Sequence, residues 1–330
     1  MRQVADLAGV AMSSVSRVLS SHPDVSPEMR RRVIAAVEAL GYKPNLLAQG
    51  LRRRETLSVG FVVGDISNPL LAQIVMGAET ALRESGYSML LTNSEGDPEL
   101  DAEHVLLFEQ RRVDGLILST AMEGHERTLD ALRLADVPIV VVDREMPPEL
   151  RASRVLSDHH TGMAAATRHL LDLGHRRIGL ILGQPVRPTI ERRRAVEDAF
   201  AERGLPLTFA VLEGRFSAEH AEHATRELLS GPEPPTAIVA AGNQLVVGAL
   251  RVLAARGVEL PRDLSFVGCD DVDITELHRP PIATVRRDNV ELGRVSAELL
   301  LRRLGGEDDP AEVVLPTEFV ARASLGPPPV

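Results

Sequence analysis

Short apolar runs alternate with amphipathic stretches from Leu57 onward, and this alternation constrains the fold more than any other feature. The runs predict strands at 58–63, 88–92, 115–118, 139–142, 178–182, 210–212, 237–240 and 265–267, with a short late strand at 313–315. The stretches between them predict helices at 71–85, 99–111, 161–173, 192–203, 218–229, 245–256 and 290–304. Such alternation is typical of parallel, doubly wound sheets, and residues 56–330 are long enough for two lobes.

The charge of the chain is divided unevenly along the sequence. Residues 1–55 hold nine Lys/Arg and five Asp/Glu, a net charge of +4. The whole chain holds 37 basic and 47 acidic residues, so the remainder holds 28 basic and 42 acidic residues, a net charge of −14. A basic head on an acidic body indicates a DNA-binding module attached to a second function.

Several classes of protein are disfavoured by the sequence. The most apolar stretch, 238–255, is interrupted by Asn243, Gln244 and Arg251, so no membrane span is expected, and the N-terminus lacks the apolar core of a secretion signal. Cys269 is the single cysteine, which excludes an intrachain disulfide and favours the cytoplasm. Dinucleotide, phosphate-loop and nucleophile-elbow motifs are absent, so no enzyme and no cofactor are expected. His220 and His223 share a predicted helix, but without a third ligand an exposed face is the better interpretation than a metal site.

The first residues predict a helix-turn-helix. A short apolar face of Val4, Leu7 and Ala8 ends at Gly9, and a second helix follows at about 12–19, with Val15, Val18 and Leu19 facing inward. A third helix begins after the N-cap Ser26 and ends at Gly41, and its apolar residues recur at helical spacing as Met29, Val33, Val37 and Leu40.

The outward face of the second helix offers Met12, Ser13, Ser14, Ser16 and Arg17. In the DNA major groove an arginine can bond guanine with both nitrogens of its fork, and serines reach phosphates or base edges. The alternative is an ordinary solvated helix face.

After Pro44, Asn45 is a possible new N-cap, and the segment from there to Arg54 could become ordered on DNA. It would then insert an apolar wedge into the minor groove and place its arginines, Arg52 among them, on phosphates. The alternative for this segment is a basic linker.

Polar residues follow the predicted strands of the body. They are Asp65 to Asn68, Asp143-Arg144, Gly183, Glu213 to Phe216, Gly242-Asn243 and Asp270-Asp271. Ligands of doubly wound sheets bind beyond the carboxyl ends of the strands, so two facing lobes would bring these groups to one cleft. Carboxylates and arginines suit a polyhydroxylated ligand, and Phe216 could stack on a sugar face. Each residue alone could instead be a turn residue, a helix cap or part of the core.

The head resembles that of the lactose-repressor/galactose-repressor family. The residues that carry the resemblance are Val4-Ala5, Ala8-Gly9-Val10, Val15 to Leu19, Val25 to Glu28, Arg32-Val33, Leu40 to Tyr42 and Pro44-Asn45. The resemblance extends through the chain and implies an all-α helix-turn-helix domain (1–44), a hinge helix and linker (45–56), and a periplasmic-binding-protein-like α/β body (57–330). The lobes of that body are expected at about 57–157 with 286–316, and at about 158–285 with 317–330.

The same resemblance assigns roles to individual residues. It implies that Met12, Ser13 and Arg17 read bases and that Leu51 wedges into the minor groove. The implied effector contacts are Asn68, Asp143, Arg192, Phe216 and Asp270. We add Asn243 as a candidate contact because Gly242-Asn243 follows a predicted strand of the body. Two departures concern the ligand: Gly242-Asn243 stands where the family has Asn-Asp, and Leu70-Leu71 stands where ribose-type members often have aromatics, which disfavours a common pentose.

The sequence therefore favours a cytoplasmic transcriptional repressor that binds double-stranded operator DNA and responds to a small polar effector, a carbohydrate or a related metabolite. Two-fold DNA sites require a dimer. The C-terminal Pro327-Pro328-Pro329 cannot continue a helix, so we expect a homodimer rather than a tetramer. The alternative is a small-molecule receptor that does not act on DNA.

Overall fold

The computed structural model of this chain describes residues 1–19, 24–42 and 55–329. The chain divides into two compact units, Met1–Leu57 and Ser58–Val330. Within the described ranges, no helix is both long and apolar enough to cross a membrane.

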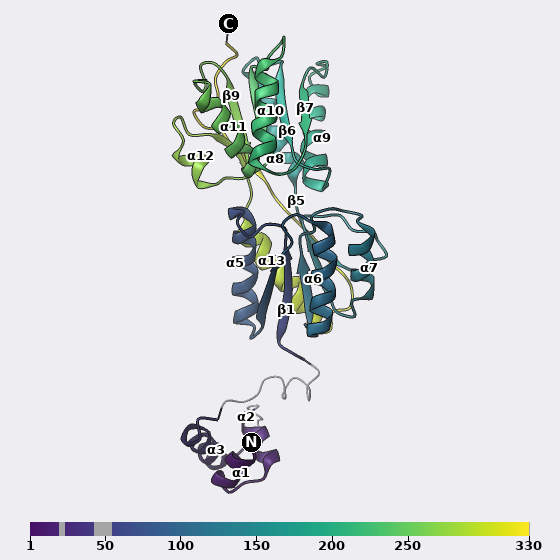
Figure 1. Cartoon of the computed structure of the whole chain (residues 1–330), viewed down its shortest axis with the longest axis vertical. Coiled ribbons are helices and arrows are strands. Elements are labelled where there is room, and N and C mark those ends of the chain that lie inside the picture. The colour runs from purple at the N-terminus through teal and green to yellow at the C-terminus, as the bar shows by residue number, and fades with distance from the viewer. Residues whose placement is uncertain (20–23, 43–54, 330) are drawn as a thin grey trace. The chain divides into compact units, whose positions relative to one another are not determined.

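The first unit contains α1 (Arg2–Ala8), α2 (Met12–Leu19) and α3 (Pro27–Ala39) (Figure 1). Gly9 ends α1 in the left-handed conformation, with φ of 62°, and the Ser26 hydroxyl caps α3 by accepting from the backbone N–H of Met29. Buried residues of all these helices form one small core: Val4, Ala5, Ala8, Val15, Val18, Val33 and Ala36. The predicted helix-turn-helix is confirmed.

Two leucines from the apolar patterns of the head are exposed and do not join its core. Leu7 is 57% exposed, because the short helix α1 presents Val4, Ala5 and Ala8 to the core instead. Leu40 is 43% exposed, because α3 has already ended at Ala39 and Leu40 is its C-cap. Ala36 takes the buried place one turn earlier.

The second unit consists of two lobes, each built on a six-stranded sheet (Figure 1). The first sheet has the order β11-β5-β4-β3-β1-β2, and its strands are β1 (Ser58–Val63), β2 (Ser88–Asn93), β3 (Gly115–Leu118), β4 (Ile139–Val142), β5 (Ser153–Ser157) and β11 (Glu312–Leu315). Its helices are α5 (Pro69–Glu84), α6 (Pro98–Arg111), α7 (Glu126–Leu134) and α13 (Asn289–Leu304). Apolar side chains cover both faces of the sheet, as a parallel sheet requires.

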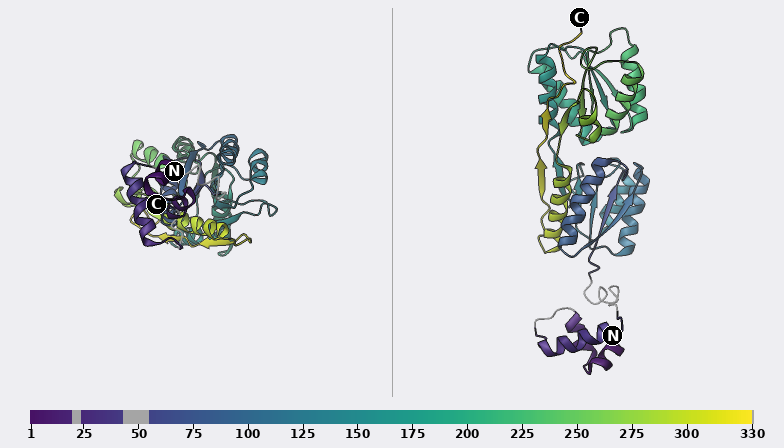
Figure 2. Two further views of the ribbon diagram at one scale, coloured as in Figure 1. Left: turned by 90° about the horizontal axis from the view of Figure 1, so that it is seen from below. Right: turned by 90° about the vertical axis from the view of Figure 1, so that its left-hand side faces the viewer.

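The second sheet repeats this order as β12-β10-β9-β8-β6-β7. Its strands are β6 (Ile178–Leu182), β7 (Ala210–Glu213), β8 (Ala237–Ala240), β9 (Ser265–Cys269), β10 (Ala283–Arg286) and β12 (Glu318–Val320). The helices of this lobe are α8 (His159–Asp172), α9 (Arg187–Ala201), α10 (Ala218–Ser230), α11 (Asn243–Ala255) and α12 (Asp273–Leu277). Figure 2 shows the yellow C-terminal strands running along one side of both lobes.

The predicted fold class, a helical head with a two-lobed doubly wound body, is confirmed, but several elements were not predicted. Strands β5, β10 and β12 and helices α7 and α12 are short and carry polar residues, so their patterns were too weak to separate from loops. Strand β12 pairs antiparallel with β10, which departs from the otherwise parallel pattern. Helix α9 begins at Arg187 and not at Arg192, because Pro188 suits its first turn. The predicted domain and lobe boundaries stay predictions.

Close backbone contact joins α5 to α13 in the first lobe. A Cβ atom on Gly77 would lie 2.0 Å from the carbonyl oxygen of Val290, and one on Gly293 would lie 1.9 Å from that of Ile74. Only glycine therefore allows these helices to meet at this distance. The contact fixes α5, whose N-terminus contributes to the site described next.

Candidate functional site

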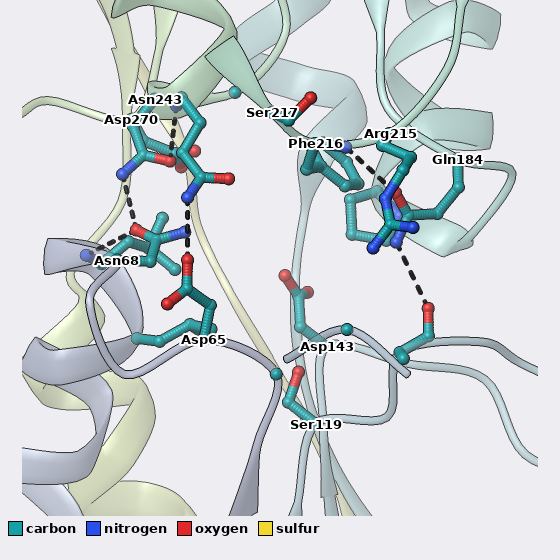
Figure 3. Close-up of a pocket in the computed structure, with 18 of the residues that line it drawn as sticks. Asp65, Asn68, Ser119, Asp143, Gln184, Arg215, Phe216, Ser217, Asn243 and Asp270 are labelled. Carbon is teal, nitrogen blue, oxygen red and sulfur yellow. Dashed lines mark hydrogen bonds between the residues drawn. The ribbon is translucent and has the colours of Figure 1, made fainter. Parts of the chain in front are cut away.

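A cavity of about 760 Å³ lies between the lobes, at the carboxyl ends of their strands. Figure 3 shows residues of the first lobe, such as Asp65 and Asp143, facing residues of the second lobe, such as Phe216 and Asp270. The six predicted effector contacts all line the cavity: Asn68, Asp143, Arg192, Phe216, Asn243 and Asp270. The structure thus brings them together, and their binding of an effector stays a prediction.

Asp143 and Asp270 occupy equivalent positions in the two lobes. Each directly follows a central strand, β4 or β9, and each has a positive φ, 56° and 68° respectively. The backbone N–H of Asp143 donates to Val155 of β5, and that of Asp270 donates to Val285 of β10. Both residues are buried, with 4% exposure. A left-handed residue turns the chain sharply at the strand end, and aspartate tolerates this conformation better than most residues.

Arg287 joins the two aspartates. It follows β10, and its Nη1 pairs with Asp143 while its Nε lies 3.2 Å from Oδ1 of Asp270. Nη1 also donates to the hydroxyl of Ser157 at 3.1 Å. Because β10 was not predicted, sequence analysis gave no reason to select Arg287.

His159 lies beside this pair and was also missed as a site residue. Its Nε2 is 2.9 Å from Oδ2 of Asp143, and its Nδ1 is 3.2 Å from Nη2 of Arg192. Arginine can only donate, so Nδ1 accepts and Nε2 carries the hydrogen that is donated to Asp143, which describes a neutral imidazole. Burial lowers the pKa of His159 to about 4, although Asp143 opposes this shift. Burial would raise the pKa of Asp143, but His159 and Arg287 hold it well below its usual value.

Arg192 combines satisfied and unsatisfied donors. It is 4% exposed, its Nη1 donates to the carbonyl oxygen of Ala241 at 2.9 Å, and its Nη2 lies 3.7 Å from Asp270. Its Nε has no acceptor among the residues that the structure describes. A buried donor without an acceptor is costly, so Arg192 is an incompletely satisfied cation at the cavity wall.

Amide side chains bridge the lobes at the N-termini of α5 and α11. The Oδ1 of Asn68 caps α5 through the N–H of Leu70 and also accepts from Nδ2 of Asn243 at 2.6 Å. Next to this bridge, Nε2 of Gln244 donates to Oδ2 of Asp65 at 2.9 Å (Figure 3). Two predicted effector contacts are therefore bonded to each other, and the Asp65–Gln244 bridge beside them was not predicted.

Phe216 lies over a glycine platform on the other side of the cavity. A Cβ atom on Gly183 would lie 2.3 Å from its ring, and one on Gly242 would lie 3.1 Å away. The ring is half-buried against the second-lobe core and also lines the cavity. The structural and ligand-binding interpretations of this residue are thus compatible.

The predicted DNA-binding residues fall into two groups. On α2, Met12, Ser13 and Arg17 are exposed, and Ser14 and Ser16 are half-buried. Asn45, Leu51 and Arg52 lie outside the described residues. Arg32 of α3 binds the end of α1: its Nη2 donates to the carbonyl oxygens of Ala8 and Gly9 at 2.6 and 3.0 Å. These two bonds satisfy carbonyl oxygens at the C-terminal end of α1, immediately before α2 begins.

The histidines of α10 do not form the exposed pair that was expected. His223 is exposed, but the ring of His220 is half-buried and its Nε2 is 3.1 Å from the carbonyl oxygen of Leu182. Across the described part of the chain, no group of three His, Cys, Asp or Glu side chains could hold a metal ion.

Comparison with known proteins gives consistent matches along the whole chain. Residues 1–45 match the family model described as bacterial regulatory proteins, lacI family, and residues 167–325 match a periplasmic binding protein-like domain. The chain is 31% identical to the HTH-type transcriptional repressor PurR of Haemophilus influenzae (strain PittEE) over 98% of both chains.

Solved structures agree with these matches. The transcriptional regulator CelR–cellobiose complex is 33% identical, with a TM-score of 0.74 over 98% of both chains. The lac repressor dimer bound to operator and the anti-inducer ONPF is 26% identical, with a TM-score of 0.86 over 97% of both chains.

Proposed function

The chain belongs to the lacI family of bacterial regulatory proteins, whose members are transcriptional regulators and not enzymes, and on this premise we propose a specific function. The protein is a sequence-specific DNA-binding repressor that acts in the cytoplasm. It is controlled by a small, polar, sugar-like effector bound between its lobes. The observation that carries this proposal is the presence in one chain of a helix-turn-helix and a cavity lined by both lobes.

Arg17 and its neighbours on α2 read the operator in this proposal. The exposed side chains of Met12, Ser13 and Arg17 face away from the core formed by Val15 and Val18, as a recognition helix requires. Leu51 serves as the minor-groove wedge and Arg52 as a phosphate contact, with Asn45 at the start of that segment. A two-fold operator presents two equal half-sites, so the functional unit is a homodimer.

The effector bridges the two lobes. Its hydroxyl groups accept from the guanidinium of Arg192 and donate to Asp270, and its C–H face stacks on Phe216. Support comes from the place of these three residues in the cavity lining and from the similarity to a structure with cellobiose. Binding shifts the population of lobe arrangements and thereby the DNA affinity, which requires a difference in affinity between the two arrangements, typically about 1–3 kcal/mol.

Selection from a random pool of double-stranded DNA tests this function. We expect the purified full chain to enrich a two-fold symmetric site with a central step that is easily unstacked. Arg17→Ala should relax the base preference within each half-site, and Leu51→Ala should weaken specific binding more than nonspecific binding. Arg226→Ala, a change on the exposed surface of α10, is the matched control and should leave the enriched site unchanged. Enrichment of no sequence would favour a small-molecule receptor without DNA function.

A further inference from the structure

Four of the charged side chains that line the cavity form one ion-paired cluster: Asp143, Asp270, Arg192 and Arg287. The carboxylates of Asp143 and Asp270 contact Arg287, and Asp65 accepts from Ser67 and Gln244. Because His159 is neutral, Arg192 and Arg287 balance the two buried aspartates. The inner part of the cavity therefore holds no excess negative charge that would repel an anionic ligand.

Arg215 is the exception among the cavity-lining guanidinium groups. Arg144 donates to the carbonyl oxygens of Thr120 and Asp143, whereas the exposed guanidinium of Arg215 makes no hydrogen bond or ion pair within the described part of the chain. Its nearest acidic neighbour in sequence, Glu213, instead pairs with Arg193 at 3.0 Å. The guanidinium of Arg215 thus has no directly bonded carboxylate among the described residues and is available to a ligand.

Hydrogen bonds of the backbone fix the second-lobe loop that carries Arg215. The carbonyl oxygen of Arg215 accepts from the N–H of Ser217 at 2.8 Å, and the N–H of Phe216 donates to Oε1 of Gln184 at 3.1 Å. Figure 3 shows the guanidinium group extending from the second lobe toward the first. Its Nη2 lies 3.7 Å from the point that a Cβ atom on Gly96 would occupy, so the side chain reaches the loop before α6.

We propose that the effector is anionic and that Arg215 binds its charged group, a carboxylate or a phosphate. This inference rests on the proposed function, in which the cavity holds a sugar-like effector. A guanidinium fork matches both oxyanions with two parallel hydrogen bonds, which makes it a specific receptor for them. The hydroxyl groups of the same ligand occupy the other part of the cavity, at Arg192 and Asp270.

Glu95 supplies an internal control for this assignment. It lines the cavity next to Gly96 and forms no ion pair with Arg215 in the described structure, so it adds an exposed negative charge near the proposed anion. Its removal should strengthen anion binding because it removes a repulsive charge. If no anion binds beside Arg215, removal of the Glu95 charge should leave anion binding unchanged.

The first test measures binding of simple anions to the full-length protein. We would follow the heat-unfolding midpoint in phosphate, in acetate and in chloride at equal ionic strength and pH 7, since a ligand that binds the native state raises this midpoint. We expect phosphate or acetate to stabilise the wild type relative to chloride. Arg215→Gln should weaken that anion about tenfold or more, the loss of one charge-assisted contact. Arg215→Lys should retain part of the affinity, and Glu95→Gln should increase it.

Controls and a second test separate the possible outcomes. Arg226→Gln, on the exposed face of α10, should behave as the wild type. Equal stabilisation of the wild type and Arg215→Gln would be a general salt effect and would overturn the proposal.

The second test compares the binding of glucose, glucuronate and glucose 6-phosphate. We expect preferential binding of the acid or of the phosphate, whichever matches the simple anion that stabilised the protein in the first test. Tighter binding of glucose that is unchanged in Arg215→Gln would contradict an anionic effector. DNA selection with the same preparation reports separately on the proposed regulatory function.

Discussion

The two lobes share one strand order and one unusual residue, a left-handed aspartate after the strand that ends beside the cavity, yet the two aspartates have different surroundings. Asp143 of the first lobe accepts from the N–H of Ser157, from His159 and from Arg287. Asp270 of the second lobe contacts Arg287 and, at 3.7 Å, Arg192, and its Oδ2 accepts no hydrogen bond from any described residue. The same backbone position thus has a saturated carboxylate in one lobe and a partly unsatisfied one in the other.

This difference separates structural support from ligand recognition. Asp143 holds together β5, the start of α8 and the segment after β10, which all lie where the chain passes between the lobes. Asp270 keeps an acceptor oxygen available at the cavity. A duplicated architecture can therefore use equivalent residues for different purposes, and sequence equivalence alone does not identify the ligand contact.

Substitution of each aspartate by asparagine should separate the two roles. Asp143→Asn leaves a buried arginine and histidine without their anion, so we expect a loss of about 3–5 kcal/mol in the free energy of unfolding. Asp270→Asn retains the Asp143–Arg287 pair and should cost about 1–2 kcal/mol, while it weakens effector binding about tenfold. Urea unfolding of the full chain, monitored by circular dichroism, measures the loss of stability in each variant.

The matched control is Asp130→Asn, at an exposed ion pair with Arg133 on α7, which should cause no measurable change. Equal losses of stability for Asp143→Asn and Asp270→Asn would remove the distinction between the lobes. A larger loss for Asp270→Asn would reverse it.

The sequence predicted most of the sheet strands and both aspartates, but not the groups that distinguish them. Long apolar runs such as Ser58–Val63 can be recognised from local pattern alone. Strand β10 contains Thr284 and ends at Arg286, so its pattern is weak, and Arg287 directly after it was therefore not selected. The predicted helix at 161–173 lies next to His159, but the role of His159 depends on Asp143 and Arg192, which approach it only in the folded chain.

The pH dependence of stability offers a second test of the saturated first-lobe site. An ordinary histidine takes up a proton near pH 6.5, whereas folded His159 does so only near pH 4. Between these values the unfolded state binds more protons, so the free energy of unfolding should fall as the pH falls, by at most about 1.4 kcal/mol per pH unit for this group. The comparison is between the wild type and His159→Gln, which can still donate to Asp143 and accept from Arg192.

Urea midpoints between pH 4.5 and 7.5 should show a flatter profile for His159→Gln than for the wild type. Burial also lowers the pKa of His175, which contributes a slope of the same sign to both proteins. The difference between the profiles therefore isolates His159. Parallel profiles would mean that His159 takes up its proton at the same pH in the folded and unfolded states, which would contradict the lowered pKa of this buried histidine.

The smallest expected effect concerns the bridge between the lobes at Asp65 and Gln244. Gln244→Ala removes one hydrogen bond that joins the lobes and leaves the Asn68–Asn243 bridge in place. We expect a stability loss below about 1 kcal/mol, typical of a single partly exposed hydrogen bond, together with a larger radius of gyration in small-angle scattering because the cleft opens more often. Gln73→Ala is the matched control, since Gln73 accepts from Asn289 at 2.9 Å within the first lobe. Because both changes remove one amide hydrogen bond, only the position of the bond distinguishes them, and equal scattering profiles would show that the Asp65–Gln244 bridge does not hold the lobes together.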